Sequence, residues 1–239
     1  KTGTSVADVN GDGLLDIYVC YSGLATEEGR SNQLFINKGK GDNNVPQFVD
    51  EAAAYGLDAK GSYSTQAVFF DYDLDGDLDM FLLNHSKTFY SPFYNSTKLR
   101  NTRHPFFGNS LYRNDGNNFV NVSESAGIYG SGLNFGLGVS ISDFNQDGWP
   151  DIYVSNDYDE QDFLYINKGD GTFKDTSKKS FGHISKFSMG NDAADVNNDG
   201  VMDLVTLDML PEDNYRQKIL KGSDDYDRYQ LAVDSSYHK

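Results

Sequence analysis

Cysteine is almost absent from this chain: Cys20 is the only one in 239 residues, so no intrachain disulfide can form. No apolar run approaches the ~18 residues that a transmembrane helix needs, which excludes a membrane span of that kind. The sequence starts Lys-Thr-Gly and lacks the basic and apolar regions of a signal peptide. We therefore expect any export signal or membrane anchor to lie outside this segment.

Basic residues are also scarce, 20 against 36 acidic ones, which gives a formal net charge of −16. That charge argues against nucleic acid as a partner, because no basic surface would offset the phosphates. Glutamate contributes little to it: 30 of the 36 acids are Asp, accompanied by 21 Asn and 24 Gly. These residue types favour turns over helices. Together with 16 Tyr and 16 Phe, they predict short strands joined by tight acidic turns.

One motif, D-x-[D/N]-x-D-G-x-x-D, occurs four times, at Asp8–Asp16, Asp71–Asp79, Asp143–Asp151 and Asp195–Asp203. Each copy follows a short alternating segment and runs directly into an apolar, β-rich one. A second element, similar to Leu-Tyr-x-Asn followed by a Gly-rich turn, begins at Leu34, Leu111 and Leu164. The unit is therefore strand, Asp loop, strand, connection, strand, turn, strand. Four antiparallel strands in this order make a blade of a β-propeller.

The predicted fold is all-β: a single propeller segment over residues 1–239, built from about four blades of four antiparallel strands. The predicted blades are 1–62, 63–133, 134–186 and 187–239, the last one incomplete because it lacks the Leu-Tyr-x-Asn strand. Near the C-terminus, Pro211 and Gly222 bracket a predicted short helical insertion. Since a closed ring must pair its last blade with its first, we expect a partial propeller that belongs to a larger one, with seven blades as the working estimate.

The Asp motif has the spacing of a calcium loop, with side-chain oxygens at positions 1, 3, 5 and 9, a backbone carbonyl at position 7 and Gly at position 6. An all-oxygen set favours Ca²⁺ over zinc or copper, and the chain would hold up to four ions. The alternatives are ion-free acidic turns and an EF-hand, but position 12 lacks the Glu that an EF-hand requires. The predicted ligands are Asp8, Asn10, Asp12, Leu14 and Asp16; Asp71, Asp73, Asp75, Asp77 and Asp79; Asp143, Asn145, Asp147, Trp149 and Asp151; and Asp195, Asn197, Asp199, Val201 and Asp203. Leu14, Asp77, Trp149 and Val201 stand at position 7 and would bind through the carbonyl alone.

With its Phe135-Gly136 pair ahead of the third Asp loop, the chain resembles the FG-GAP or VCBS-type repeat over residues 1 to about 207. This is the blade of the integrin α-subunit head. The chain is also similar to large surface repeat proteins of Bacteroidota-type bacteria and, distantly, to cartilage acidic protein. The resemblance implies a Ca²⁺-loaded propeller, secreted or anchored on the outer cell surface.

Two functions follow as hypotheses. The first is a calcium-stabilised binding or scaffold module for a protein or glycan partner, without catalytic residues. The alternative is a calcium-dependent carbohydrate-active enzyme, similar to polysaccharide lyases or hydrolases that carry such propellers. An enzyme needs an acid, base or nucleophile cluster in a pocket. Only His85 and His104, which flank one long insertion, could converge in this way, and a cleft between them would favour the enzyme.

That insertion, residues 84–111, reverses the charge of the chain. No Asp or Glu occurs from Met80 to Asn114, a stretch that holds five basic residues, and residues 84–111 contain six aromatic ones. Arg and aromatic side chains are enriched at interface centres, so Lys98, Arg100 and Arg103 are candidate partner-binding residues. The alternative is that the loop folds over acidic neighbours in its own chain.

Overall fold

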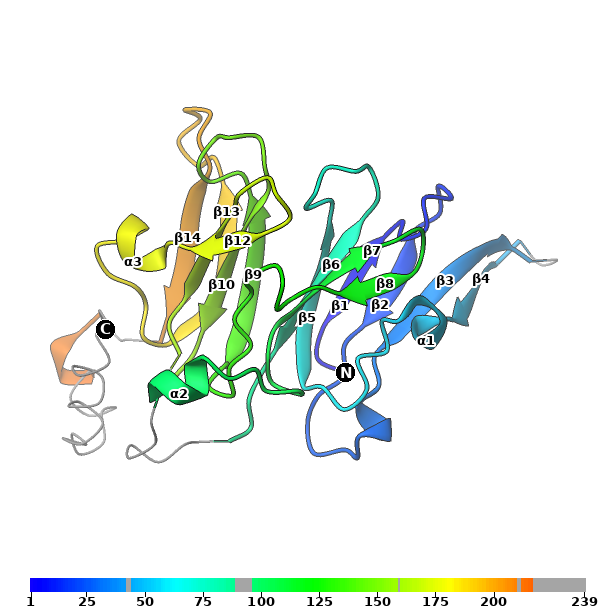
Figure 1. The fold of residues 1–239 in the computed structure, drawn as a ribbon, viewed down its shortest axis with the longest axis horizontal. Coiled ribbons are helices and arrows are strands. Elements are labelled where there is room, and N and C mark those ends of the chain that lie inside the picture. The colour runs from blue at the N-terminus through cyan, green and yellow to red at the C-terminus, as the bar shows by residue number, and fades with distance from the viewer. Residues whose placement is uncertain (42–43, 89–95, 159, 210–211, 217–239) are drawn as a thin grey trace.

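The computed structural model describes residues 1–41, 44–88, 96–158, 160–209 and 212–216. Their strands form three four-stranded sheets and one two-stranded sheet, and every strand pair is antiparallel. Within each sheet, neighbouring strands follow one another in the sequence. The sheets stand in a row, face against face (Figure 1). The all-β, propeller-like fold predicted from the sequence is confirmed.

The strands alternate with short connections in the order that the repeat predicts. The first sheet contains β1 (Thr4–Ala7), β2 (Asp16–Val19), β3 (Gln33–Lys40) and β4 (Pro46–Asp50). The second contains β5 (Ser64–Phe70), β6 (Asp79–Asn84), β7 (Ser110–Asn114) and β8 (Phe119–Asn121). The third contains β9 (Gly136–Ser142), β10 (Asp151–Asn156), β11 (Phe163–Asn167) and β12 (Phe173–Asp175). The fourth contains β13 (Ser188–Ala194) and β14 (Asp203–Asp208).

Helices occur only as short pieces of the connections in the described ranges. They are the 3₁₀ turn η1 (Glu28–Arg30), α1 (Ala52–Tyr55), α2 (Ser96–Arg100) and α3 (Ser177–Ser180). Among the described residues, no helix has the length and apolar character needed to cross a bilayer. Residues 214–216 are helical, and the rest of the helix predicted between Pro211 and Gly222 falls almost wholly outside the described residues.

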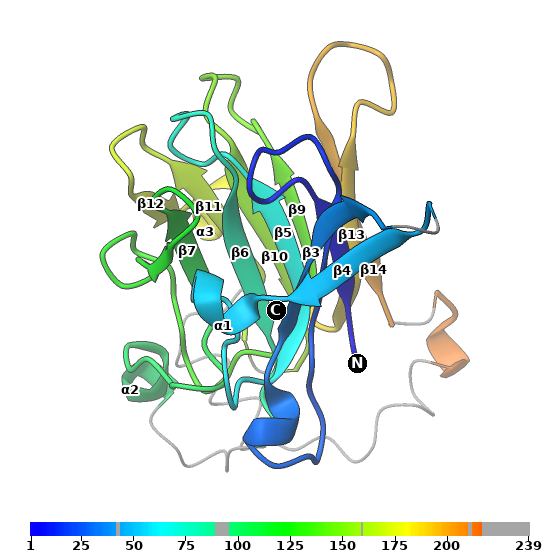
Figure 2. The same cartoon turned by 90° about the vertical axis from the view of Figure 1, so that its right-hand side faces the viewer.

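The first strand of each sheet packs against the first strand of the next, so that β1 contacts β5, β5 contacts β9 and β9 contacts β13. Small residues permit this approach: a Cβ added at Gly138 of β9 would lie 3.0 Å from the Cα of Gly190 in β13. Thr65 of β5 links the strands by donating from Oγ1 to the carbonyl of Gly136, at 3.1 Å. The described strands form an open arc, with β13 and β14 at one end and the first sheet at the other (Figures 1 and 2).

The core consists of two apolar layers between neighbouring sheets. Tyr18 of β2 and Cys20, which follows it, pack against Met80 and Leu82 of the second sheet, and Cys20 is fully buried. The opposite face of the second sheet packs through Phe81 and Leu83 against the third. Each fully buried side chain of this size contributes about 1.5–3 kcal/mol. The alternation along the second strand of each blade therefore joins each blade to the next.

Candidate metal centre

The four Asp loops lie at the same edge of the arc, at the top of Figure 1, each joining the first strand of a sheet to the second. The position-1 Asp follows the last residue of the first strand, and the position-9 Asp is the first residue of the second strand. The predicted ligands of one loop are thus held between two strand ends that are paired with each other. Each loop therefore belongs to a single blade.

Hydrogen bonds shape the four loops in the same way. The position-1 carboxylate accepts the N–H groups of positions 5 and 6, with N···O distances of 2.8–3.1 Å in all copies. The position-5 carboxylate accepts the N–H of position 7 at 2.8–3.1 Å. These bonds curl the backbone around the side chains and leave the remaining carboxylate lone pairs available to a cation.

Left-handed backbone occurs at two positions of every loop. Position 6 is Gly in all four, with φ between 83° and 99°, as the predicted sharp turn requires. Position 4 is also left-handed, at Gly11 (φ 70°), Leu74 (59°), Gln146 (60°) and Asn198 (60°). A side chain such as that of Leu74 adopts this conformation at a cost of about 1 kcal/mol or more. Position 4 could not be recognised from the sequence, because its residue type differs among the copies.

The second loop brings its carboxylates closest together. Asp71, Asp73 and Asp79 each offer an oxygen within 4.8 Å of the others. Ligand oxygens on opposite sides of a calcium ion lie about 4.6–5.2 Å apart, twice the Ca–O distance, so this separation fits such an ion. Two buried oxygens in the loop, Oδ1 of Asp73 and Oδ1 of Asp77, have no hydrogen-bond partner. A buried carboxylate oxygen without a partner is costly unless a cation compensates it.

The electrostatics of the second loop also favour a bound cation. Burial raises the pKa of Asp79 to about 7, and the charges of Asp73 and Asp77 add to the effect. The pKa of Asp73 is raised by burial and then by the charges of Asp75 and Asp71. Burial likewise raises the pKa of Asp77, followed by the charge of Asp75. The ionised loop therefore repels itself, and a divalent cation would relieve the repulsion.

The all-oxygen donor set, the spacing and the unpartnered oxygens of the second loop fit a hard cation such as Ca²⁺. Position 1, 3, 5 and 9 side chains would hold it, and the ion would neutralise the crowded carboxylates. In the third loop, burial raises the pKa of Asp151 to about 6, and the charges of Asp147 and Asp143 add to the effect. The first, third and fourth loops carry Asn at position 3. There the amide Oδ1 accepts the N–H of position 5 at 2.9–3.1 Å.

The position-9 residues Asp16, Asp79 and Asp151 are fully buried, although an uncompensated carboxylate is costly in a core. Each accepts two backbone N–H groups. Asp79 accepts those of Tyr72 at 3.0 Å and Asn114 at 2.8 Å, and the other two accept the equivalent pairs. These bonds offset the desolvation of the carboxylate.

The Asn of each Leu-Tyr-x-Asn strand is a structural residue of the site that the sequence analysis missed. Asn37, Asn114 and Asn167 donate from Nδ2 to the carbonyl of position 8, each at 3.2 Å. Through Oδ1 they accept a backbone N–H of the following turn at 2.7–3.0 Å. The first three Asp loops are therefore each hydrogen-bonded to the third strand of their blade. The recurrence of Asn in the three copies was the available signal.

The described arginines of the basic insertion contact neighbouring segments of the same chain. Arg103 donates from its guanidinium to the carbonyls of Asn109 and Ile128, both at 2.8 Å. Arg100, at the end of α2, forms a 2.8 Å ion pair with Glu160, whose side chain is fully buried. Lys98 lies in α2 with an exposed side chain. The contacts of the two arginines favour the alternative in which the loop covers its own neighbours. Four of the aromatic residues, at positions 89, 90, 93 and 94, lie outside the described residues.

The histidines flanking the insertion pack against aromatic rings. His85 makes an edge contact with Phe135, with ring centroids 4.8 Å apart, and burial lowers its pKa. His104 stacks on Phe107 at 4.0 Å and accepts the backbone N–H groups of Phe106 and Phe107 through Nδ1. Both imidazoles therefore serve the packing of the insertion.

The chain belongs to the FG-GAP-like repeat family, whose model matches residues 8–82 and 143–206, 139 of the 239 residues. The matched segments include all four Asp loops. No curated protein matches the chain. One similar solved structure concerns specific recognition of non-reducing terminal N-acetylglucosamine by an Agrocybe aegerita lectin. It is 20% identical with a TM-score of 0.45, and the alignment covers 85% of this chain and 46% of that one. The chain thus spans less than half the length of that structure.

Proposed function

We propose that the chain is a calcium-stabilised, non-catalytic binding or scaffold module that works outside the cell and presents its loops to a protein or glycan. The observation that carries this proposal is the second Asp loop, with three carboxylates converging and two buried oxygens lacking a partner. The same hydrogen bonds recur in the other loops, which extends the proposal to four ions. Membership of the FG-GAP-like repeat family supports a repeat module of this kind.

The size of the expected stabilisation follows from mass action. Extracellular calcium modules bind with Kd values of about 10⁻⁴–10⁻³ M. At a tenfold excess of free ion, each site adds about 1.4 kcal/mol, so four independent sites add about 5–6 kcal/mol. The total stability of a domain is about 5–15 kcal/mol, so the ions would supply a large part of it.

The test is thermal unfolding of the full chain in excess EGTA and at increasing Ca²⁺, with Mg²⁺ as the comparison ion. We expect the melting temperature to rise by many degrees with Ca²⁺ and by much less with Mg²⁺, which keeps more of its water. Asp75→Asn should remove one step of a calorimetric Ca²⁺ titration. Glu124→Gln, which changes one exposed acid outside the loops, should remove none. An unchanged melt in EGTA would contradict the proposal.

The partner class is tested separately, by binding of the Ca²⁺-loaded chain to an array of purified glycans and, in parallel, to immobilised extracellular proteins. We expect saturable binding to one class that is lost in EGTA and regained on adding Ca²⁺. Binding that persists undiminished in EGTA would show that the Ca²⁺-loaded propeller surface is not responsible. Turnover of a glycan during the assay would favour the enzyme alternative.

A further inference from the structure

A hydrogen-bonded path joins the second Asp loop to the third across the boundary between their blades. The carbonyl of Tyr72, at position 2 of the second loop, accepts a hydrogen bond from Nδ2 of Asn167 at 2.8 Å. Asn167 lies in β11, the third strand of the next blade. Both residues are buried, at 3% and 2% exposure, so water does not compete for this bond.

Each end of the path is a predicted calcium ligand. The N–H of Tyr72 donates to Oδ2 of Asp79 at 3.0 Å, which is the position-9 residue of the second loop. The N–H of Asn167 donates to Oδ1 of Asp151 at 2.8 Å, the position-9 residue of the third loop. The path from one buried carboxylate to the other therefore consists of two residues and three hydrogen bonds.

Further contacts of Tyr72 and Asn167 reinforce the connection. The Tyr72 ring packs on Phe173 of β12, with ring centroids 5.9 Å apart, and Phe173 is paired with Asn167 in the β11–β12 hairpin. Nδ2 of Asn167 also donates to the carbonyl of Pro150, position 8 of the third loop, at 3.2 Å. One amide group thus binds a backbone carbonyl of each loop.

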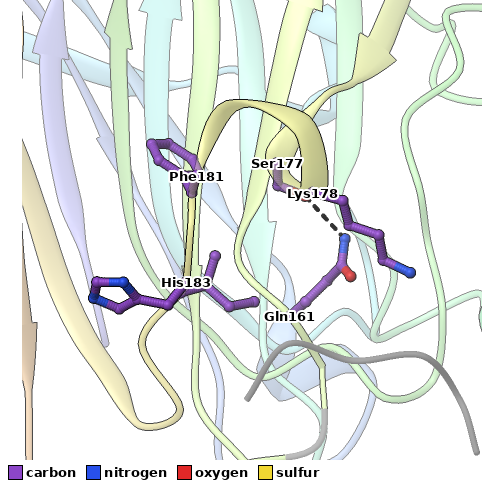
Figure 3. Close-up of a pocket in the computed structure, with 6 residues that line it drawn as sticks. Gln161, Ser177, Lys178, Phe181 and His183 are labelled. Carbon is purple, nitrogen blue, oxygen red and sulfur yellow. Dashed lines mark hydrogen bonds between the residues drawn. The ribbon is translucent and has the colours of Figure 1, made fainter.

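The β11–β12 hairpin that carries Asn167 is also fixed at its opposite end. Gln161, which precedes β11, donates from Nε2 to Oγ of Ser177 at 3.1 Å and to Oδ2 of Asp175, the last residue of β12, at 3.0 Å. Figure 3 shows the Gln161 amide turned toward Ser177. A hairpin held at both ends moves as one piece, so that a displacement of Tyr72 is passed on to the third loop.

The first and second loops lack this connection. Val9 stands at position 2 of the first loop, and Asn114 is the third-strand Asn of the second blade. The Asn114 side chain donates to the carbonyl of Leu78 in its own blade at 3.2 Å. Within the described ranges, no hydrogen bond joins the Asn114 side chain to Val9. The path is therefore a feature of the second and third loops and not of every pair of blades.

We propose that the second and third loops bind Ca²⁺ with positive cooperativity through the contact of Tyr72 with Asn167, an inference that rests on the calcium binding proposed above. The first ion orders its own loop and this contact, so the second ion binds at a lower cost in conformational entropy. Repulsion between the ions acts in the opposite direction, but each ion lies among its own carboxylates and salt screens the remainder. We expect a gain in affinity of about fivefold, equal in both directions.

The test measures the Ca²⁺ affinity of the third loop in the full chain, with the second loop intact or disabled. Trp149, the only Trp of the chain, stands at position 7 of the third loop, so its fluorescence during a Ca²⁺ titration reports that loop. Asp75→Asn disables the second loop without changing the path, and should weaken the third loop by about fivefold. Asp12→Asn disables the first loop in the same way and should leave the third loop unchanged.

Two further variants assign the effect to the path. Asn167→Ala removes the bond to Tyr72, and in this background Asp75→Asn should weaken the third loop by less than about twofold. Asn37→Ala is the matched control, because it removes the equivalent bonds within the first blade. In that background the fivefold effect of Asp75→Asn should remain.

The reverse measurement follows amide hydrogen exchange in the second loop. Asp147→Asn disables the third loop and should raise, by about fivefold, the Ca²⁺ concentration that protects the N–H of Gly76. An unchanged or higher affinity of the third loop in Asp75→Asn, or an equal loss in Asp12→Asn, would overturn the coupling and leave calcium binding intact. A chain in which no loop takes up Ca²⁺ would overturn the proposed function and the coupling together.

Discussion

Asp77 has two groups that lie in the second calcium loop, its backbone carbonyl and its side-chain carboxylate, and only the carbonyl is expected to bind the ion. Its position calls for the backbone carbonyl, and Leu14, Trp149 and Val201 at the same position have no side-chain ligand to offer. Yet the Asp77 carboxylate lies close to that of Asp75, and one of its oxygens is buried without a partner. The side chain therefore adds to the repulsion within the ion-free loop.

We predict opposite effects for two neighbouring substitutions. Asp75→Ala should abolish Ca²⁺ binding at the second loop, because it removes a ligand that also accepts the N–H of Asp77. Asp77→Ala should leave occupancy nearly intact and raise the melting temperature in EGTA, because it removes one of the mutually repelling charges. Calorimetric Ca²⁺ titration and thermal unfolding check this. Equal loss of binding in both variants would show that Asp77 is itself a ligand.

Asn114 tests whether the third strand supports the metal loop. Asn114→Ala removes the bonds to Leu78 and to the turn at Asn117, and we expect a loss of about 1–3 kcal/mol of unfolding free energy. Urea unfolding in EGTA measures this loss. Asn118→Ala, an exposed residue in the same turn, is the matched control and should change stability by less than about 0.5 kcal/mol. Unchanged stability of Asn114→Ala would show that these bonds contribute nothing.

At the scale of elements, the insertion between β6 and β7 is held to the propeller by its arginines. The guanidinium of Arg103 lies against Gly130, where a Cβ would be 2.5 Å from Cζ, and it bonds two backbone carbonyls. The Arg100–Glu160 pair connects α2 to the connection between β10 and β11. The loop thus bridges the second and third blades. The positive charge of the insertion is paired, through Arg100, with Glu160 of the same chain.

Arg103→Met should accordingly lower the unfolding free energy, by about 2–4 kcal/mol, because it leaves two carbonyls without their charged donor. Lys179→Met, at an exposed side chain of α3, serves as the control and should be near neutral. Thermal and urea unfolding measure both. If Arg103→Met leaves stability intact but abolishes capture of a glycan or protein partner, the insertion is a contact surface instead.

The sequence predicted the blade, its strands and the Asp loops because those features repeat with one spacing. It did not predict the burial of Asp79, since the two backbone N–H groups that compensate the charge come from segments 7 and 35 residues away. It did not reveal the partners of Arg100 and Arg103 either, because Glu160 and Ile128 lie on another blade or its connection. Local patterns therefore sufficed for the repeat unit, and the contacts between units required the structure.

At the scale of the whole molecule, stability is unevenly distributed along the arc. All six residues of β6 and of β10 are buried, whereas the last four of β14 are exposed. Each sheet packs mainly on its neighbours, so the chain is close to a one-dimensional array whose ends have one neighbour fewer.

The rates of amide hydrogen exchange should therefore follow this difference in burial. We predict that amides of β13 and β14 exchange about tenfold or more faster than those of β6 and β10 in the Ca²⁺-loaded chain, because opening the end sheet breaks one interface and not two. Mass spectrometry of peptic fragments measures it. Uniform protection across the four sheets would show that the arc opens only as a single cooperative unit.

The hydrogen bonds between the position-9 Asp and the Asn of the third strand have a consequence for how blades can be added to such a chain by duplication. Because the loop, its anchor and the turn that orients the anchor all belong to one blade, duplicating that blade copies a complete set of these hydrogen bonds. An evolving chain can thus gain or lose a blade without substitutions in the remaining ones.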